Sequence, residues 1–151
     1  MILEPGVWTL SGSWRATEET ALIHFDGECV VSDQQDGRYA IDVTAKTETS
    51  SHLEYGIWVA RNETGLYDAT IMGTDVDLIG TAKLESIPHV AMLLNRDATV
   101  CLTVAVFSLP EVFGARGFLR SADTTFTFEI AISPKHVDIQ ADNIVEFKPR
   151  R

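Results

Sequence analysis

The chain has few cysteines and few basic side chains. The first shortage argues against a disulfide-rich protein, and the second argues against one that binds nucleic acid. Its 151 residues contain 2 cysteines, Cys29 and Cys101, too few for a disulfide-rich scaffold. Both lie among apolar neighbours, where a free cysteine behaves as a small hydrophobe, so we expect both to be reduced. The 12 basic side chains stand against 22 acidic ones, and the net charge of −10 opposes binding to nucleic acid. We therefore expect no nucleic-acid partner.

Long apolar segments and catalytic motifs are also missing from the sequence. No uncharged run approaches the roughly 18 residues of a membrane helix, and the residues after Met1 lack the basic and apolar regions of a secretory leader. We expect a cytoplasmic protein without a membrane partner. The sequence has no His-x-x-x-His, Cys-x-x-Cys, Gly-x-Ser-x-Gly or glycine-rich phosphate loop, so we expect neither a metal site nor a cofactor.

The longest apolar run, Ala98–Leu109, carries no charge. In an extended chain Val100, Leu102 and Val104 point to one side, while Cys101 and Phe107 point to the other, so neither face suits water. We expect a strand that is buried on both faces. The preceding run, His89–Leu94, is also apolar on both faces, and the two should pair as a central hairpin.

The remaining segments alternate apolar and polar residues with the period of a half-buried strand. About ten to twelve short strands, without an internal repeat, predict an all-β class and one β domain over residues 1–151. Tight connections favour an antiparallel up-and-down β-barrel of the calycin-like kind over a two-layer β-sandwich. Pro134–Gln140 is the one helix candidate, and Asp26-Gly27 suits a hairpin turn between Ala21–Phe25 and Glu28–Ser32.

Gly6-Val7-Trp8 stands at the entrance to the first predicted strand. It resembles the Gly-x-Trp of lipocalin barrels, and the resemblance implies that Trp8 closes one end of a cavity. Thr74-Asp75-Val76 faintly resembles the second lipocalin motif, without its tyrosine. The resemblance covers few residues and assigns the chain to no family.

Arg116, Phe118 and Arg120 share one face of a strand because they are two residues apart. Two guanidinium groups beside an aromatic ring predict a clamp for a carboxylate or phosphate, which would form the polar end of an internal cavity. The alternative is a solvent-facing strand whose arginines pair with the excess acid, and the sequence favours that alternative about two to one. His24, His89 and His136 are candidate acids or bases without a recognisable catalytic frame.

The leading hypothesis is a barrel that binds a small hydrophobic or amphiphilic organic anion. The predicted ligand-binding residues are Trp8, Trp14, Tyr39, Phe126 and Phe128 as the lining and Arg116 and Arg120 at the polar end. Two alternatives stay open, an oligomeric β-sandwich interaction or scaffold protein and a small barrel enzyme of the isomerase or cyclase kind. A homo-oligomer through the Pro88 to Pro110 hairpin is expected because outward apolar residues need a cover.

Overall fold

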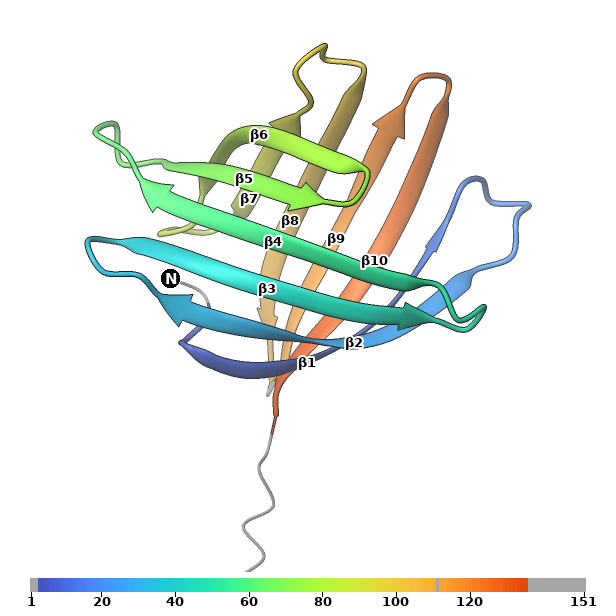
Figure 1. Cartoon of the computed structure of the whole chain (residues 1–151), viewed down its shortest axis with the longest axis horizontal. Helices are drawn as coiled ribbons and strands as arrows, with labels where there is room; N and C mark the ends of the chain where they lie inside the picture. The colour runs from blue at the N-terminus through green and yellow to red at the C-terminus, as the bar shows by residue number, and fades with distance from the viewer. Residues whose placement is uncertain (1–2, 111, 136–151) are drawn as a thin grey trace, which may run out of the picture.

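In a computed structural model of the protein, which describes residues 3–110 and 112–135, the chain forms one closed antiparallel barrel of ten strands (Figure 1). The strands follow one another round the ring in chain order, and β1 closes it by pairing with β10. Their bounds are β1 Gly6–Arg15, β2 Ile23–Asp33, β3 Arg38–Thr47, β4 His52–Arg61, β5 Tyr67–Gly73, β6 Val76–Lys83, β7 His89–Leu94, β8 Val100–Leu109, β9 Val112–Ser121 and β10 Thr124–Pro134. The predicted up-and-down barrel is therefore confirmed, and the sandwich is not formed.

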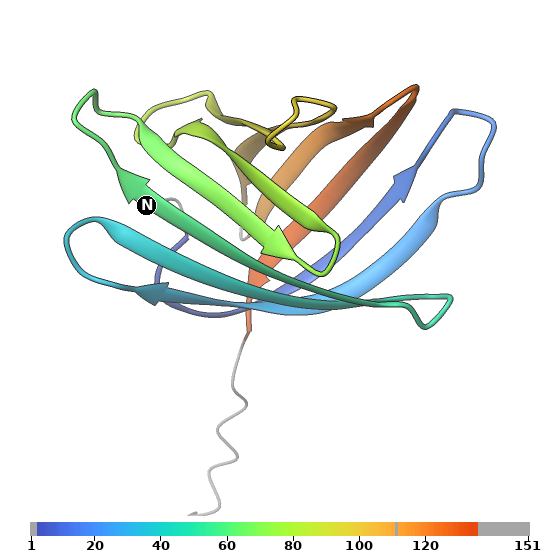
Figure 2. The same ribbon diagram turned by 45° about the horizontal axis from the view of Figure 1, so that its top comes forward.

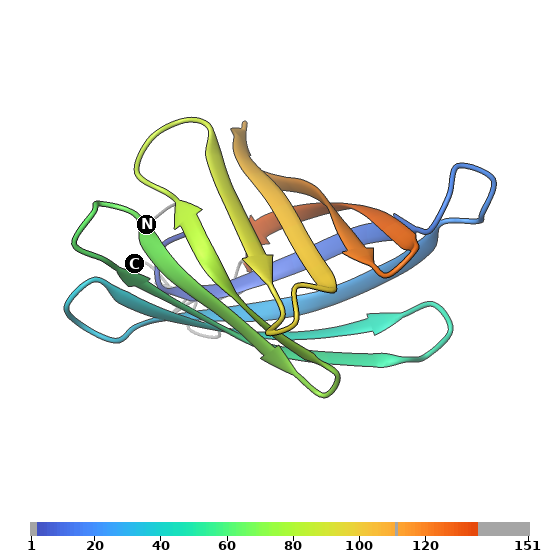
Figure 3. The same ribbon diagram turned by 90° about the horizontal axis from the view of Figure 1, so that it is seen from above.

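The register of the strands fixes which side chains point into the barrel. Trp8 on β1 pairs with Cys29 on β2, and Cys29 pairs with Val43 on β3. Directly paired residues share a face of the sheet, so such a row stays on one side all round the ring. Buried residues such as Leu78 and Leu93 lie on this inner side. Figures 2 and 3 show the wall of β3–β5 facing the wall of β8–β10 across the interior.

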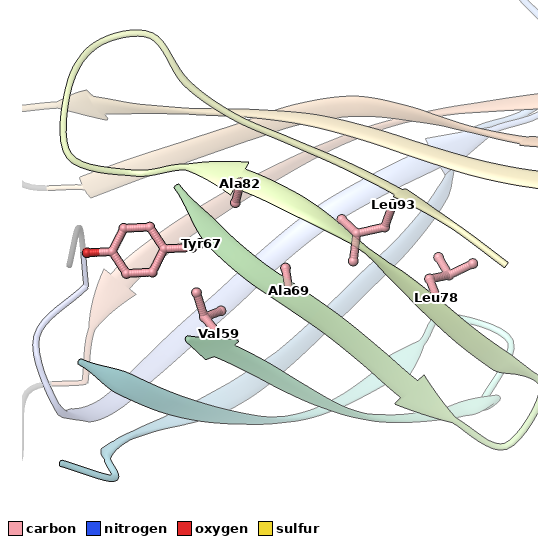
Figure 4. Close-up of a cluster of buried hydrophobic side chains, with 6 residues drawn as sticks. All are labelled: Val59, Tyr67, Ala69, Leu78, Ala82 and Leu93. Carbon is pink, nitrogen blue, oxygen red and sulfur yellow. The ribbon is translucent and has the colours of Figure 1, made fainter. Parts of the chain in front are cut away.

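Two separate clusters of inward side chains hold most of the core, and Phe25, Ala45 and Ala115 are buried outside them. One comes from β4–β7, and Figure 4 shows its members Val59, Tyr67, Ala69, Leu78, Ala82 and Leu93. The other comes from β1 and β2 and consists of Trp8, Leu10, Cys29 and Val31. The core therefore lines parts of the wall, as expected for a barrel that is wider than its side chains can fill.

The two ends of the barrel differ in burial. We call the end at which β1 begins the Trp8 end and the opposite end the Trp14 end. Along β1, Trp8 and Leu10 are buried whereas Trp14 is half-buried. The inward residues of β4 and β5 follow the same gradient, from buried at the Trp8 end to half-buried at the Trp14 end. The gradient does not hold all round the ring, because Phe25 on β2 and Ala45 and Thr47 on β3 are buried at the Trp14 end, whereas Tyr39 on β3 is half-buried at the Trp8 end.

The predicted turn at Asp26-Gly27 is wrong, because β2 runs without a break from Ile23 to Asp33. Gly27 points inward against the backbone carbonyl of Thr44 and against Ala45, where a Cβ atom would have no room. This glycine serves the close approach of β2 and β3, a role that a sequence pattern cannot separate from that of a turn glycine.

The central hairpin forms as expected, since β7 and β8 pair from His89–Val106 to Leu94–Cys101. Its predicted burial on both faces is wrong, because residues 100–107 of β8 are all half-buried. In a barrel, one face of the strand looks into an incompletely filled interior and the other lies on the outer wall.

The described residues contain no helix long and apolar enough to cross a membrane. Of the predicted helix Pro134–Gln140, Pro134 ends β10, and residues 136–140 lie outside the described residues.

Candidate ligand-binding interior

The interior surface over β8–β10 is apolar and incompletely covered. Half-buried inward side chains on this wall are Leu102, Val104, Val106, Leu119, Phe126, Phe128 and Ile130. An inward side chain of a closed barrel keeps solvent contact only where the interior or an open end lets water in. The exposure of these residues therefore shows that water reaches the inner surface over β8–β10.

Aromatic side chains gather at the Trp14 end. Trp14 pairs directly with Phe128 across β1 and β10, and its ring centroid lies 5.8 Å from that of Phe25 with an interplanar angle of 35°. Gly117 makes this arrangement possible, because a Cβ atom there would lie 2.8 Å from the Phe128 ring. Phe126 adds a further inward ring on β10. This end offers a flat ligand several aromatic faces.

Hydrogen-bonded aromatic residues close the opposite end. Trp8 is 7% exposed, and its Nε1 donates to the backbone oxygen of Glu4 at 3.0 Å. Tyr67 is 5% exposed, and its hydroxyl donates to Oε1 of Glu85 at 3.0 Å. Arg61 holds the same carboxylate, with Nη1 at 3.1 Å from Oε1. Trp8 is thus buried and hydrogen-bonded at this end, and the closure of a cavity that the lipocalin resemblance implies for it stays a prediction.

Three titratable groups of the interior are neutral at physiological pH. Burial raises the pKa of the Cys29 thiol to about 11, which keeps it protonated and unreactive. Burial is also the main cause that raises the pKa of Tyr55 and of Tyr67, with Asp75 adding to the first and the hydrogen bond to Glu85 adding to the second. This environment suits an uncharged or amphiphilic ligand better than a fully charged one.

His89 contributes a polar atom that has no protein partner among the described residues. Its pairing with Val106 places it on the inner face of β7, close to the Trp8 end. The Nδ1 atom is buried and makes no hydrogen bond. An unsatisfied buried polar atom destabilises a fold by roughly 1–3 kcal/mol, and a ligand group reaches this one only if the side chains that cover it move, because water does not contact it.

Five of the seven predicted site residues face the interior, namely Trp8, Trp14, Tyr39, Phe126 and Phe128. Whether they bind a ligand stays a prediction. The expected position of Arg116 and Arg120 at the polar end of the cavity is wrong, because both lie on the outer face of β9. Arg116 Nε lies 3.1 Å from Oε1 of Glu129, and its guanidinium carbon lies 5.7 Å from the Phe107 ring centroid. Arg116 therefore matches the alternative given above, in which an arginine on a solvent-facing strand pairs with an acidic residue.

The sequence pattern groups the residues of β9 correctly, and the structure places the group with Arg116 and Arg120 outside and the other group inside. The inward group contains Phe113, Ala115 and Leu119, which pair with the inward residues of β8.

His24 lies on the outer face, and His136 lies outside the described residues. Sequence reasoning missed the unpartnered atom of His89, for which no local signal exists. Within the described part of the chain, no three His, Cys, Asp or Glu side chains are grouped so that they could hold a metal ion.

No family model and no curated protein sequence matches the chain. Among solved structures, the S-type phycobiliprotein lyase CPES from Guillardia theta is similar, with a TM-score of 0.66 and 6% identity over 88% of this chain and 89% of that chain. A de novo designed fluorescence-activating β-barrel is similar with a TM-score of 0.42 and 10% identity over 84% of this chain and 91% of that chain. The likeness to the lyase shows that the chain has the fold of a lipocalin-like barrel.

Proposed function

We propose that the barrel binds a small apolar or amphiphilic molecule in its interior, with entry from the Trp14 end. The observation that carries this proposal is the wall of half-buried inward apolar side chains on β8–β10, including Leu102, Leu119 and Phe128. A folded protein without a ligand normally buries such residues against one another, because apolar surface left in contact with water loses about 25 cal/mol per Å². A ligand that covers this wall would recover that free energy.

The ligand's polar part is proposed to meet His89. A hydroxyl, a carbonyl or a carboxyl group near Nδ1 would supply the hydrogen bond that this atom lacks. The two arginines lie outside, so they no longer support an anionic ligand. A polar group that hydrogen-bonds to His89 Nδ1 without a full charge is sufficient for the proposal.

Native mass spectrometry of protein purified directly from its expression host tests the proposal. We expect a retained small molecule, or uptake of one equivalent of an apolar fluorescent dye by the empty protein. Protein that carries no adduct and leaves dye fluorescence at the background level would contradict the proposal. A His89→Leu variant should retain the apolar dye but lose at least about fivefold in affinity for a long-chain alcohol, because the apolar side chain offers no hydrogen bond.

A second candidate function is self-association through the outer face of the Pro88 to Pro110 hairpin. The observation that favours it is the exposure of large apolar side chains on this face, with Met92 at 54% and Val90 at 39%. Self-association needs no internal ligand, so both activities can belong to one protein. The small barrel enzyme stays an alternative, and burial keeps Cys29, Tyr55 and Tyr67 protonated by raising the pKa of each.

A further inference from the structure

Three large apolar side chains stand together on the outer wall where β4, β5 and β6 run side by side (Figure 1). They are Trp58, Met72 and Ile79, with exposures of 45%, 50% and 59%. Trp58 and Ile79 lie in one cross-strand row through Thr70, and Met72 follows Thr70 on the outer face of β5. Because these three strands are direct neighbours in the ring, the side chains form one continuous surface. We call these three residues the β4–β6 face.

The indole ring of Trp58 lies flat against the wall. A Cβ atom on Gly56 would come within 2.4 Å of ring carbon Cη2 of Trp58, so the six-membered part of the ring covers Gly56. Only glycine leaves room for a ring at this height above the strand. One side of the ring thus rests on the backbone, and the opposite side presents an aromatic surface to solvent.

Two carboxylates stand next to this ring. Gly56 pairs directly with Asp42 on β3 and with Met72 on β5, and Glu54 precedes Gly56 by two residues on the outer face of β4. These neighbours lie about 5 Å from Gly56 across the strands and about 7 Å from it along β4. Asp42 and Glu54 are both exposed, and in the described part of the chain neither forms an ion pair with a basic side chain.

The basic residues of β3 leave this negative border in place. Arg38 and Lys46 each lie four residues from Asp42, which is about 13 Å along an extended strand. The exposed side of the Trp58 ring is therefore bordered by two acids, in a chain whose net charge is −10. A cation that stacks on the ring can reach both carboxylates, and the ring itself attracts a cation through its negative face.

We propose that the β4–β6 face docks an apolar segment of a protein partner through an arginine in that segment. A guanidinium group is planar, stacks on an indole and pairs with carboxylates, so Trp58, Asp42 and Glu54 all favour it. Charge complementarity therefore identifies the occupant. Apolar side chains beside this arginine cover Met72 and Ile79, which a free organic cation would leave in contact with water. The contact lies on the outer wall and is independent of ligand binding inside the barrel.

Fluorescence anisotropy with a short labelled peptide that alternates arginine and leucine tests the proposal. We expect saturable binding by the wild type. The same peptide with citrulline in place of arginine should bind at least about tenfold more weakly, because citrulline keeps the shape of arginine but has no charge. A peptide that alternates arginine and serine should bind at least about threefold more weakly, because it leaves the apolar side chains of the face uncovered.

Variants of the protein locate the contact. Trp58→Ala should weaken binding of the arginine-leucine peptide at least about fivefold, since the ring that holds the guanidinium group is lost. The double variant Asp42→Asn, Glu54→Gln should weaken it at least about tenfold, because both charges are removed while the ring and the strands are kept. Circular dichroism shows whether each variant is folded.

Two matched controls carry equivalent changes elsewhere on the barrel. The double variant Asp97→Asn, Asp123→Asn removes two exposed acids from the loops that follow β7 and β9, and it should leave the peptide affinity within about twofold of the wild type. Phe118→Ala removes an aromatic ring with 41% exposure from the outer wall of β9 and should also leave the affinity within about twofold.

Three results would overturn the proposal. They are the absence of saturable peptide binding, equal affinity for the arginine and citrulline peptides, and equal weakening by the site variants and their controls. Full competition by free arginine amide at the concentration of the peptide would assign the surface to a small organic cation and would overturn a protein segment as the occupant. Uptake of the apolar dye by Trp58→Ala separates all these outcomes from a failure of ligand binding inside the barrel.

Discussion

The Trp8 end and the Trp14 end of the barrel contain the same kinds of side chain but differ in their hydrogen bonds. At the Trp8 end, Trp8 and Tyr67 are 7% and 5% exposed, and each donates a hydrogen bond to a fixed oxygen. At the Trp14 end, Trp14 and Phe128 are half-buried. The indole N–H of Trp14 donates no hydrogen bond to any of the described residues. A buried tryptophan or tyrosine normally finds a hydrogen-bond partner, as Trp8 and Tyr67 do, whereas the Trp14 ring keeps contact with solvent.

Replacement of the two tryptophans should show the largest difference between the ends. Trp8→Ala removes a buried ring from the core and should lower the free energy of unfolding by about 3–5 kcal/mol. Trp14→Ala should lower it by less than half as much, because part of that ring already contacts water. Urea unfolding of both variants measures the difference. Equal losses of stability would contradict the assignment of a closed and an open end.

The thiol at the closed end should make stability depend on alkaline pH. The pKa of Cys29 is about 11 in the folded protein and near 9.0 in an exposed thiol, so the unfolded chain loses its proton first as the pH rises. The stabilisation by the neutral buried thiol is complete below pH 9.0 and is lost between pH 9.0 and about 11, with a total of about 3 kcal/mol. Comparison of the unfolding free energies of wild type and Cys29→Ala over this range measures it.

The two thiols should also differ in reactivity. Cys29 is buried, whereas Cys101 lies half-buried on the outer side of β8. A maleimide at neutral pH should label Cys101 in the folded protein and Cys29 only after denaturation. Cys101→Ser provides the control, and rapid labelling of that variant would show that the Trp8 end opens.

Loss of the Tyr67 hydroxyl should have a smaller effect. Tyr67→Phe keeps the ring but leaves the Glu85 carboxylate with Arg61 alone, so we expect a loss of about 1 kcal/mol in unfolding free energy. Faster amide exchange in the loop between β4 and β5 should accompany it, because this bond ties the start of β5 to the segment after β6. Unchanged exchange there would contradict the role of Tyr67 in closing the end.

The smallest effect is expected for Arg116→Ala. The Arg116–Glu129 pair is exposed, with side chains at 65% and 66%, so its removal should change stability by less than about 1 kcal/mol. Dye affinity should stay within about twofold of the wild type, since the residue lies outside the barrel. A loss of affinity of about tenfold would instead place the ligand on the outer wall.

Local sequence patterns predicted the strands and their faces well. The alternation places Val76, Leu78, Ala82 and Leu84 on one inward face, and the structure confirms this face. Periodicity is a property of the strand itself, so it can be read without knowledge of the fold. The same holds for Trp58, which the alternation places opposite Tyr55 and Ile57 and which lies on the outer face.

The choice of the inner face and the degree of burial could not be read in the same way. Both faces of the strand with Arg116 and Leu119 contain bulky residues, and only the pairing with β8 and β10 decides which is inside. The run Ala98–Leu109 carries apolar side chains on both faces, yet β8 is half-buried, because ten strands enclose a wide interior. Burial depends on the circumference of the barrel, which no single segment specifies.

Titration of two variants with an apolar fluorescent dye tests interior binding most directly. One variant has an inward phenylalanine replaced, and the other has an outward phenylalanine replaced. Phe128 points into the barrel beside Trp14, and Phe118 lies on the outer wall with 41% exposure. Phe128→Ala should weaken dye binding at least about tenfold, whereas Phe118→Ala should leave it within about twofold of the wild type, with both variants folded by circular dichroism. If Phe118→Ala weakens dye binding and Phe128→Ala leaves the dye affinity unchanged, the result would contradict an interior binding site.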